Sequence, residues 1–242
     1  MRAILCGAGG AMGRLIGEIL GTEVVGRVSL DGFQGAAKTF EELGDVHGDI
    51  LVDFSHHSAI DSVIRYARDH RCALVIGTTG HTAGEKELIY QAAKELPVFY
   101  SGNMSLGIAV LCRLAKQAAA CFPDADIEIL EVHHNRKVDA PSGTAHMIFN
   151  ALRQVRPEAV EACGRAGEGK RKEHEIGIAS LRMGNVVGVH EVHICTPSQT
   201  LTLRHEAGSR QMLAEGAVDA ARFLMGKPAG LYTMEELLEE KA

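Results

Sequence analysis

The sequence lacks the features that mark several special classes of protein. None of its apolar runs approaches the ~18 uninterrupted residues that a membrane-spanning helix needs, so we expect no membrane partner. Proline numbers only 6 among 242 residues, and the 46% of apolar and 23% of charged residues are ordinary values, which excludes collagen-like and disordered chains. The six cysteines form no C-x-x-C pair, which excludes a disulfide scaffold. The chain is therefore expected to be globular, with one large domain or two small ones.

The sequence also lacks an excess of basic residues. Its 25 lysines and arginines stand against 31 acidic residues, whereas proteins that grip a phosphate backbone usually carry a basic excess, so we expect no nucleic-acid partner. Arg14, Glu18 and several glycines interrupt the first apolar stretch, and we therefore expect no signal peptide there. The scattered cysteines are then expected to be reduced thiols, which predicts a cytoplasmic protein.

Short apolar segments alternate with helical patterns through about the first hundred residues. The predicted strands cover residues 2–6, 23–28, 49–54, 73–77 and 98–101. Ser58 and Asp61 have the spacing of a capping box and predict one helix start. Thr82 and Glu85 predict another, in a helix that Pro97 is expected to end. Apolar strands that alternate with helices predict an α/β fold with a doubly wound parallel sheet.

The pattern changes after about residue 105. Helices are predicted over 106–122 and 142–155, and strands over 127–133, 175–183, 186–196 and 200–206, with a polar loop at 165–175. This half predicts an α+β domain with a mostly antiparallel sheet. A helical pattern at 211–225 could pack back onto the first domain, so we expect one domain of 1–105 completed by 211–242, and a second of 106–210. One face of the second sheet lacks a cover, which predicts packing between subunits in a homo-oligomer.

A glycine-rich turn joins the first strand to the first helix. Its residues are Gly7, Ala8, Gly9, Gly10, Ala11, Met12 and Gly13. Glycines allow close approach of the backbone, and the helix start presents N–H groups to a pyrophosphate, which predicts a dinucleotide site. Met12 stands where G-x-G-x-x-G needs its third glycine, although G-x-x-G-x-x-G is met. Asp31 is a candidate for the adenosine ribose and Arg27 for a 2′-phosphate, or both are surface charges, so NADH and NADPH stay open.

Two further loops follow predicted strands at the edge where open α/β sheets bind ligands. They are Gly77, Thr78, Thr79 and Gly80 after the fourth strand, and Ser101, Gly102, Asn103 and Met104 after the fifth. Their small residues and hydroxyl groups suit the nicotinamide end of a dinucleotide.

The densest group of reactive side chains lies within residues 131–145. They are His133, His134 and Lys137 near the end of a predicted strand, and Ser142, Gly143 and Thr144 at the start of a helix that Ser142 caps. The N–H groups of this helix start, together with a cationic Lys137 or His134, would favour a carboxylate. His133 and Lys137 can each give or take a proton. Adjacent strand residues point to opposite faces, so the two histidines cannot easily chelate one ion, and we expect no metal.

This segment, EVHHNRKVDAPSGTA, resembles the signature of the dihydrodipicolinate reductases. Further matches cover nearly the whole chain: GAGGAMG at 7–13, VDFS at 52–55, IGTTG at 76–80, NMSLG at 103–107, VVGVH at 186–190, RHEAGSR at 204–210 and GLYTM at 230–234. The resemblance implies a Rossmann-type dinucleotide-binding domain and a domain for substrate binding and tetramerisation, hence a homotetramer. It also implies the reduction of 4-hydroxy-tetrahydrodipicolinate or dihydrodipicolinate to tetrahydrodipicolinate by NADH or NADPH, in the diaminopimelate route to lysine.

The resemblance implies roles for single residues as well. His133 matches the catalytic acid or base and Lys137 the proton donor. The positions that bind the dicarboxylate substrate are His134, Gly143 and Thr144, to which we add Ser142, and the cofactor loops are 7–12, 77–79 and 101–104. Met104 departs from the phenylalanine that the family often has, and the pair His56 and His57 has no assigned role.

Other functions compete with this one. A related NAD(P)-dependent enzyme, such as an amino-acid dehydrogenase, would reuse both domains, but the intact segment 131–145 argues against it. A dinucleotide sensor would need a DNA- or protein-binding element, and the sequence has no helix-turn-helix signal. A scaffold without chemistry would not explain why His133 and Lys137 occur beside the predicted anion site at the helix start.

Overall fold

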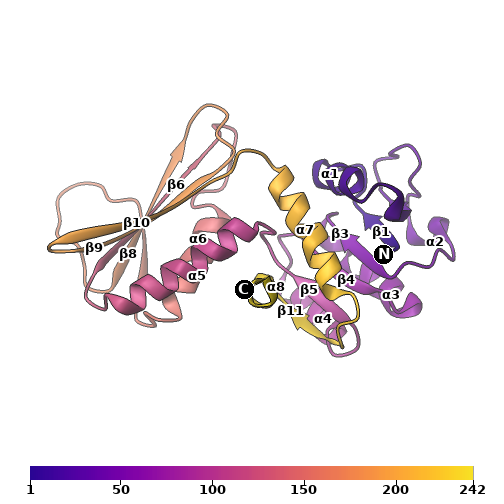
Figure 1. The fold of residues 1–242 in the computed structure, drawn as a ribbon. Helices are drawn as coiled ribbons and strands as arrows, with labels where there is room; N and C mark the ends of the chain where they lie inside the picture. The colour runs from indigo at the N-terminus through magenta and orange to yellow at the C-terminus, as the bar shows by residue number, and fades with distance from the viewer. Residues whose placement is uncertain (242) are drawn as a thin grey trace. The chain divides into compact units, whose positions relative to one another are not determined.

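The computed structural model describes residues 1–241, which divide into two compact units (Figure 1). The first unit comprises Met1–Leu106 and the segment from Gln211 onward, and the second comprises Gly107–Arg210. The chain therefore leaves the first unit once and returns to it through its C-terminal segment.

A six-stranded sheet, in which all neighbouring strands are parallel, forms the centre of the first unit. Its strands are β1 (Ala3–Cys6), β2 (Val24–Val28), β3 (Ile50–Asp53), β4 (Ala73–Ile76), β5 (Pro97–Tyr100) and β11 (Gly230–Tyr232). They lie in the order β11-β5-β4-β3-β1-β2, and a parallel bridge between Val28 and Ala37 extends the sheet beyond β2. With that bridge counted as a strand, the order is that of a Rossmann fold, whose direction reverses between β1 and β3. The predicted doubly wound sheet is confirmed.

Helices cover both faces of this sheet (Figure 1). They are α1 (Ala11–Leu20), α2 (Phe40–Leu43), α3 (Ile60–His70), α4 (Ala83–Ala92), α7 (Gln211–Leu224) and α8 (Met234–Lys241). α1 packs beside α7, and α3 packs beside α4. Gly216 of α7 lies so close to the Met104 carbonyl that a Cβ atom there would clash with it, which shows how tightly α7 is seated. The prediction that this C-terminal helix packs on the first domain is thus confirmed.

The predicted capping box at Ser58 and Asp61 is wrong. The side chain of His56 instead accepts a hydrogen bond from the Ser58 amide and starts a short 3-10 turn, His57–Ala59. α3 follows directly from that turn at Ile60, so its first N–H groups need no capping side chain of their own.

The capping box at Thr82 and Glu85 is confirmed, since each side chain accepts a hydrogen bond from the backbone N–H of the other residue. The helix it starts ends at Ala92, however, and not at Pro97 as predicted. A residue before proline is disfavoured in helical geometry, so Leu96 cannot continue the helix, and the chain turns before β5 begins.

A five-stranded mixed sheet forms the second unit. Its strands are β6 (Asp126–His133), β7 (Val160–Cys163), β8 (Glu175–Arg182), β9 (Val189–Thr196) and β10 (Gln199–Glu206). In the order β10-β9-β6-β8-β7, the first two pairs are antiparallel and the last two are parallel. The expectation of a mostly antiparallel sheet is therefore wrong. The helix α6 (Gly143–Arg153) crosses over after β6, so the chain re-enters the sheet parallel to β6, and β7 was not predicted at all.

Two helices, α5 (Leu106–Cys121) and α6, contribute to the core on one face of this sheet. Ser142 caps α6 as predicted, because its Oγ accepts a hydrogen bond of 3.2 Å from the Ala145 amide. On β6 the inward residues Ile127 and Ile129 belong to this apolar core. The next two inward positions on the strand are polar, and they belong to the candidate site.

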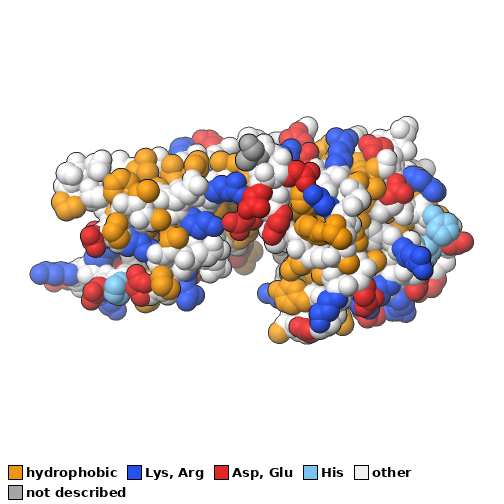
Figure 2. Space-filling view, turned by 60° about the horizontal axis from the view of Figure 1, so that its bottom comes forward, with side chains coloured by type: hydrophobic (Ala, Val, Ile, Leu, Met, Phe, Trp, Pro, Cys, Tyr) orange, Lys and Arg blue, Asp and Glu red, His pale blue; other side chains and the backbone are white. Residues whose placement is uncertain are grey.

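No helix within residues 1–241 is long and apolar enough to cross a membrane. Figure 2 shows one face of the molecule, on which lysines and arginines are scattered among acidic and apolar side chains. The charge on that face is therefore mixed.

Candidate active site

The glycine turn of the first unit, which we call the glycine cradle, is folded so tightly that several of its positions have no space for a side chain. Gly7 has a φ of +79°, and a Cβ atom there would lie under 3.0 Å from the Phe54 carbonyl. A Cβ atom on Gly13 would clash with the Gly7 carbonyl. The turn therefore packs against Phe54 only because residue 7 is glycine, and against α1 only because residue 13 is glycine. The start of α1 at Ala11 is thereby exposed to a ligand that approaches the backbone. A pyrophosphate fits this cradle.

Asp31 lies directly against the glycine turn. Its Oδ1 accepts a hydrogen bond of 2.6 Å from the Ser29 hydroxyl, and the Ser29 Oγ accepts one of 3.0 Å from the Gly9 amide. The hydrogen bond from Ser29 lowers the pKa of Asp31, which is therefore ionised at neutral pH. Arg27 lies within β2, before the carboxyl end of the strand where the ligands of such sheets bind. The structure thus brings Asp31, rather than Arg27, to the turn.

A buried carboxyl group holds the second cofactor loop. Asp53 is 1% exposed at the end of β3, and its Oδ2 accepts a hydrogen bond of 2.7 Å from the Thr78 hydroxyl. The Thr78 Oγ1 in turn accepts one of 3.0 Å from the Ser55 amide. Burial raises the pKa of Asp53, although the hydrogen bonds from Ser55 and Thr78 act to lower it. Gly77 faces the Phe54 ring, which leaves no space for a side chain. Sequence reasoning assigned no role to Asp53.

The third cofactor loop is ordered by its own polar groups. The Ser101 hydroxyl donates a hydrogen bond of 2.7 Å to the Asn103 carbonyl, and the Asn103 Oδ1 accepts one of 2.8 Å from the Ser105 amide. A Cβ atom on Gly102 would lie 3.7 Å from the Thr79 methyl group, so the loops that follow β4 and β5 are neighbours. Met104 is only 2% exposed, and its contact with a nicotinamide stays a prediction.

In the second unit, the row of inward residues on β6 ends in Glu131 and His133. Glu131 is fully buried, and it accepts hydrogen bonds of 2.7 and 2.9 Å from the two guanidinium NH groups of Arg182. Its other neighbours are the His133 Nδ1 at 2.5 Å and the Ser142 amide at 3.2 Å. The strand register explains the cluster, because His133 pairs with Arg182 on β8 and Glu131 with His190 on β9.

The charges of this cluster are well defined. Burial opposes the ionisation of Glu131, but the hydrogen bonds from Arg182, Ser180 and His133 outweigh it and hold the pKa of Glu131 at about 2. Because a carboxylate only accepts hydrogen bonds, the His133 Nδ1 must carry a proton, and its Nε2 is the atom that can exchange one. Burial and the neighbouring His133 lower the pKa of His190 to about 4, so His190 is neutral at pH 7.

Lys137 has a partner that the sequence reasoning did not name. Its Nζ lies 2.8 Å from the Asp139 carboxylate, and the Lys137 side chain is 22% exposed. The hydrogen bond from Lys137 lowers the pKa of Asp139, so the Asp139 carboxylate is ionised at neutral pH. Desolvation and the charge of Arg136 lower the pKa of His134, which is therefore neutral there.

The start of α6 completes the cluster. The Ser142 Oγ lies 3.3 Å from the His190 Nε2, while the Ser142 amide reaches Glu131. A Cβ atom on Gly143 would meet nothing within 4 Å, so the helix start is open at that residue. Ser142 and Gly143 are thus placed at an open helix start beside the buried ion cluster, and Thr144 follows them in the first turn of α6.

Several buried polar atoms of the second unit have no hydrogen-bond partner within residues 1–241. They are the Nδ1 atoms of His134, His190 and His205, and the Nε of Arg182. Buried groups of this kind are normally paired, so this cluster is built to accept water or a polar ligand. Glu131 and His133 could have been linked from sequence, because residues two apart on a strand share a face. Arg182 and His190 could not, since their register with β6 is a property of the fold.

The comparisons with known proteins agree over nearly the whole chain. The family models described as dihydrodipicolinate reductase, N-terminus and C-terminus, match residues 1–104 and 107–238. The 4-hydroxy-tetrahydrodipicolinate reductase of Caldanaerobacter subterraneus subsp. tengcongensis is 42% identical over 248 residues, and that of Clostridium novyi is 37% identical over 251 residues, each covering 99% of both chains. The dipicolinate-bound dihydrodipicolinate reductase from Paenisporosarcina sp. TG-14 shares the fold, with a TM-score of 0.80 at 24% identity over 98% of each chain.

A glycine cradle in a doubly wound sheet, on a chain with these relatives, defines an NAD(P)H-dependent oxidoreductase. Within that class, the chain belongs to the dihydrodipicolinate reductase family. The resemblance found in residues 131–145 is thereby confirmed, while the roles of the individual site residues stay predictions.

The position of Asp31 predicts a preference for NADH. Its carboxylate would repel the 2′-phosphate of NADPH and accept a hydrogen bond from the 2′-hydroxyl of NADH. We expect Asp31→Ala to move the ratio of kcat/KM values for NADH and NADPH toward NADPH by about tenfold, and the exposed control Asp61→Asn to leave it unchanged. An unchanged ratio in Asp31→Ala would contradict this assignment.

The Glu131 cluster predicts a stability that depends on pH. Glu131→Gln leaves Arg182 without its charge partner and should lower the free energy of unfolding at pH 7 by about 3 kcal/mol. The pKa of Glu131 is lowered from 4.5 to about 2, so its contribution is complete above pH 4.5 and is lost as the pH falls toward 2. Urea unfolding should therefore show that the difference in free energy of unfolding between wild type and Glu131→Gln becomes smaller as the pH falls over that range.

Glu128→Gln is the matched control for this experiment. Glu128 lies on the same strand but is 44% exposed in its ion pair with Arg171, so its replacement should cost under about 1 kcal/mol. Equal losses of unfolding free energy in Glu131→Gln and Glu128→Gln would show that the buried cluster stabilises the protein no more than an exposed ion pair does.

Proposed function

We propose that the protein reduces the cyclic dicarboxylate 4-hydroxy-tetrahydrodipicolinate, or the dihydrodipicolinate formed from it by loss of water, to tetrahydrodipicolinate. The reductant is NADH or NADPH, and the reaction is a step of the diaminopimelate route to lysine. The observation that carries this proposal is the buried Glu131–Arg182 ion pair, which holds His133 beside the open start of α6. The relatives that cover 99% of this chain bear the name of this reductase.

The second unit supplies groups that bind carboxylates. The start of α6 at Gly143 and Thr144 offers backbone N–H groups and the positive end of the helix dipole. The Lys137 ammonium offers a charge-assisted hydrogen bond, and His134 can donate another. A substrate with two carboxylates needs two such places, and these four residues together with Ser142 provide them.

The reduced dinucleotide, when bound, supplies the hydride. The residues that would hold it are Gly7, Ala8, Gly9, Gly10, Ala11 and Met12 at the cradle, Asp31 at the ribose, Gly77, Thr78 and Thr79 in the second loop, and Ser101, Gly102, Asn103 and Met104 in the third. A Cβ atom at Gly7, Gly9 or Gly13 would lie under 3.0 Å from neighbouring protein atoms, so the turn keeps a bare, tightly folded backbone, which suits the close approach of a pyrophosphate.

Lys137 is our candidate for the proton that must reach the ring after reduction. Its Nζ lies 2.8 Å from the Asp139 carboxylate, which orients the group that would donate the proton. His133 can exchange a proton only at Nε2, since Glu131 engages its Nδ1. We therefore propose His133 as the acid or base that acts with Lys137. Two ion pairs, Glu131–Arg182 and Lys137–Asp139, lie beside the proposed proton-transfer groups. A related dehydrogenase on another substrate or a sensor without chemistry explains these two pairs less well than the proposed reductase does.

The finer cellular and assembly assignments are part of the same proposal. All six cysteines are free, which supports a reducing compartment such as the cytoplasm, and the mixed charge in Figure 2 supports a protein without a nucleic-acid partner.

The second sheet supports a homotetramer. α5 and α6 pack on one face of it, whereas Leu181 on β8 points to the opposite face and is 46% exposed. Apolar strand residues in such positions are covered when two sheets pack together. We propose that the sheets of different subunits meet there.

The proposed reaction predicts how Lys137→Ala behaves. With the product that dihydrodipicolinate synthase makes from pyruvate and aspartate semialdehyde, wild-type protein should oxidise NADH or NADPH, as followed at the absorbance band of the reduced nicotinamide. Lys137→Ala should lower kcat by about 10²–10⁴-fold, because the proton donor is lost. Its affinity for the dinucleotide, measured by calorimetry, should be unchanged.

Lys170→Ala, in the exposed polar loop, is the control and should keep full turnover. Wild-type turnover in Lys137→Ala would remove the role of Lys137. Failure of folded wild-type protein to oxidise either nucleotide with this substrate would remove the proposed reaction.

The assembly proposal predicts a solution mass four times the 25.9 kDa of one chain. Light scattering after gel filtration measures it directly. Leu181→Lys should reduce the mass to that of a smaller species, because a charge cannot be buried between two sheets without a partner. A wild-type mass of one chain would contradict the proposal.

A further inference from the structure

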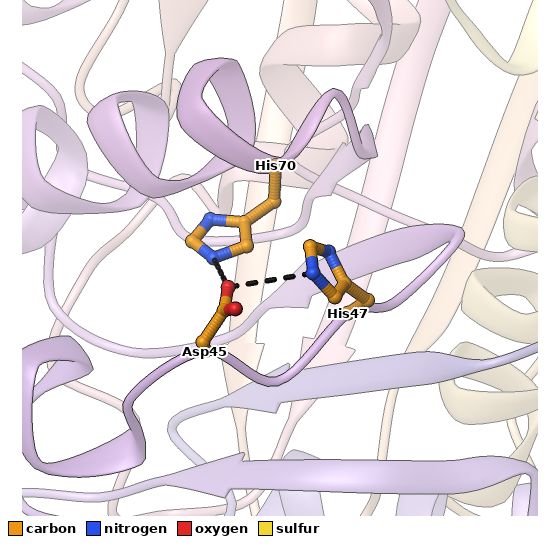
Figure 3. Close-up of side chains that lie close together, drawn as sticks. All are labelled: Asp45, His47 and His70. Carbon is orange, nitrogen blue, oxygen red and sulfur yellow. Dashed lines mark ion pairs between the residues drawn. The ribbon is translucent and has the colours of Figure 1, made fainter.

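A second group of histidines lies in the first unit, at the edge of the sheet opposite to its cofactor loops. Asp45 and His47 belong to the connection before β3, and His70 is the last residue of α3, just before β4 (Figure 3). These positions are at the amino ends of β3 and β4. The three cofactor loops follow the carboxyl ends of β1, β4 and β5, which form the opposite edge of a parallel sheet.

The three side chains converge on one point. One ligand atom from each residue lies within 4.8 Å of the other two, and both histidine Nε2 atoms point at the same Asp45 oxygen (Figure 3). The distances from Asp45 Oδ1 are 3.4 Å to His47 and 3.3 Å to His70. Charge-assisted hydrogen bonds are shorter than this, about 2.7–2.9 Å. Two ligands bound at zinc-like distances to one tetrahedral ion lie about 3.3 Å apart, which is close to the separation of the Asp45 oxygen from each histidine Nε2.

His70 is fixed in the tautomer that a metal ion needs. Its Nδ1 lies 3.0 Å from the Tyr66 carbonyl, and a carbonyl only accepts hydrogen bonds, so Nδ1 carries the proton. The lone pair of the neutral ring is then on Nε2, the atom that faces Asp45. A hydrogen bond from the non-ligating nitrogen to a carbonyl is the usual support of a metal-binding histidine.

Tyr66 also holds the other two residues in place. Its ring stacks on His70 with 4.0 Å between centroids, and its hydroxyl donates a hydrogen bond of 2.6 Å to the Val46 carbonyl. Val46 lies between Asp45 and His47, so one buried side chain orders all three ligands. This preorganisation is more than an accidental group of surface charges would show.

We propose that Asp45, His47 and His70 bind one divalent transition-metal ion, with Zn²⁺ preferred and a remaining coordination position open to water. Two imidazoles and one carboxylate suit zinc, whereas Mg²⁺ and Ca²⁺ need mostly oxygen ligands. The ion would tie the connection before β3 to the end of α3, and so would act on the stability of the first unit. The proposal does not rest on the reductase activity.

The test is calorimetric titration of the apo protein with Zn²⁺, with Co²⁺ as a spectroscopic probe of the same site. Wild type is expected to bind one equivalent more than His47→Gln and Asp45→Asn, both of which change exposed side chains and should fold. At ~100-fold excess over Kd, Zn²⁺ should raise the Tm of wild type by about 5 °C and leave the Tm of His47→Gln unchanged.

Two further variants make the test specific. His174→Asn is the matched control, because His174 is also an exposed histidine beside two carboxylates, Glu158 and Glu173. Asparagine is chosen because it tolerates the φ of +59° at this position. It should bind Zn²⁺ as wild type does. Tyr66→Phe keeps the ring and removes the hydroxyl, and should weaken binding by about 10–100-fold. Equal binding by wild type and His47→Gln, or no binding to wild type at about 1 mM Zn²⁺, would overturn the proposal.

Discussion

The ionised carboxylate of Glu131 is the interaction on which the site of the second unit depends. It is fully buried, and it is tolerated there only because Arg182, His133 and the Ser142 amide surround it. One carboxylate thus joins three segments of the chain, the end of β6, the end of β8 and the start of α6. It sets the tautomer of His133 and places the helix start beside it, so the acid–base group and the anion-binding group are held by the same charge.

The first unit solves a different problem, the close approach of a ligand to the backbone. Gly13 lets α1 pack against the turn after β1, and Gly7 lets that turn pack against Phe54, at distances that no side chain allows. Ser29 and Asp31 lie against the same turn. Asp53 is a buried carboxyl group at a strand end, and it holds the loop after β4 through its hydrogen bond with Thr78. Glu131 holds the site of the second unit in the same way. In both units, polar residues at strand ends replace the apolar residues that precede them.

Local patterns predicted much of this, and long-range pairing predicted little. The glycine turn, the capping box at Thr82, the helix cap at Ser142 and the packing of α7 follow from spacing along the chain. The partners of Glu131 do not, because Arg182 lies 51 residues away and reaches it through the register of β6 and β8. The mixed sheet was missed for the same reason, since the short strand β7 shows its place only once α6 has crossed over.

The carboxyl carbon of Glu131 offers the most direct test of this account. In protein labelled with ¹³C at glutamate carboxyl groups, the Glu131 resonance is identified by its absence from Glu131→Gln, and its shift is followed with pH. The account predicts a resonance that is constant from pH 7 down to about 3.5, with a midpoint near 2. A midpoint near the ordinary value of 4.5 would mean that the buried carboxylate is not held by Arg182 and His133, and that the site is organised in another way.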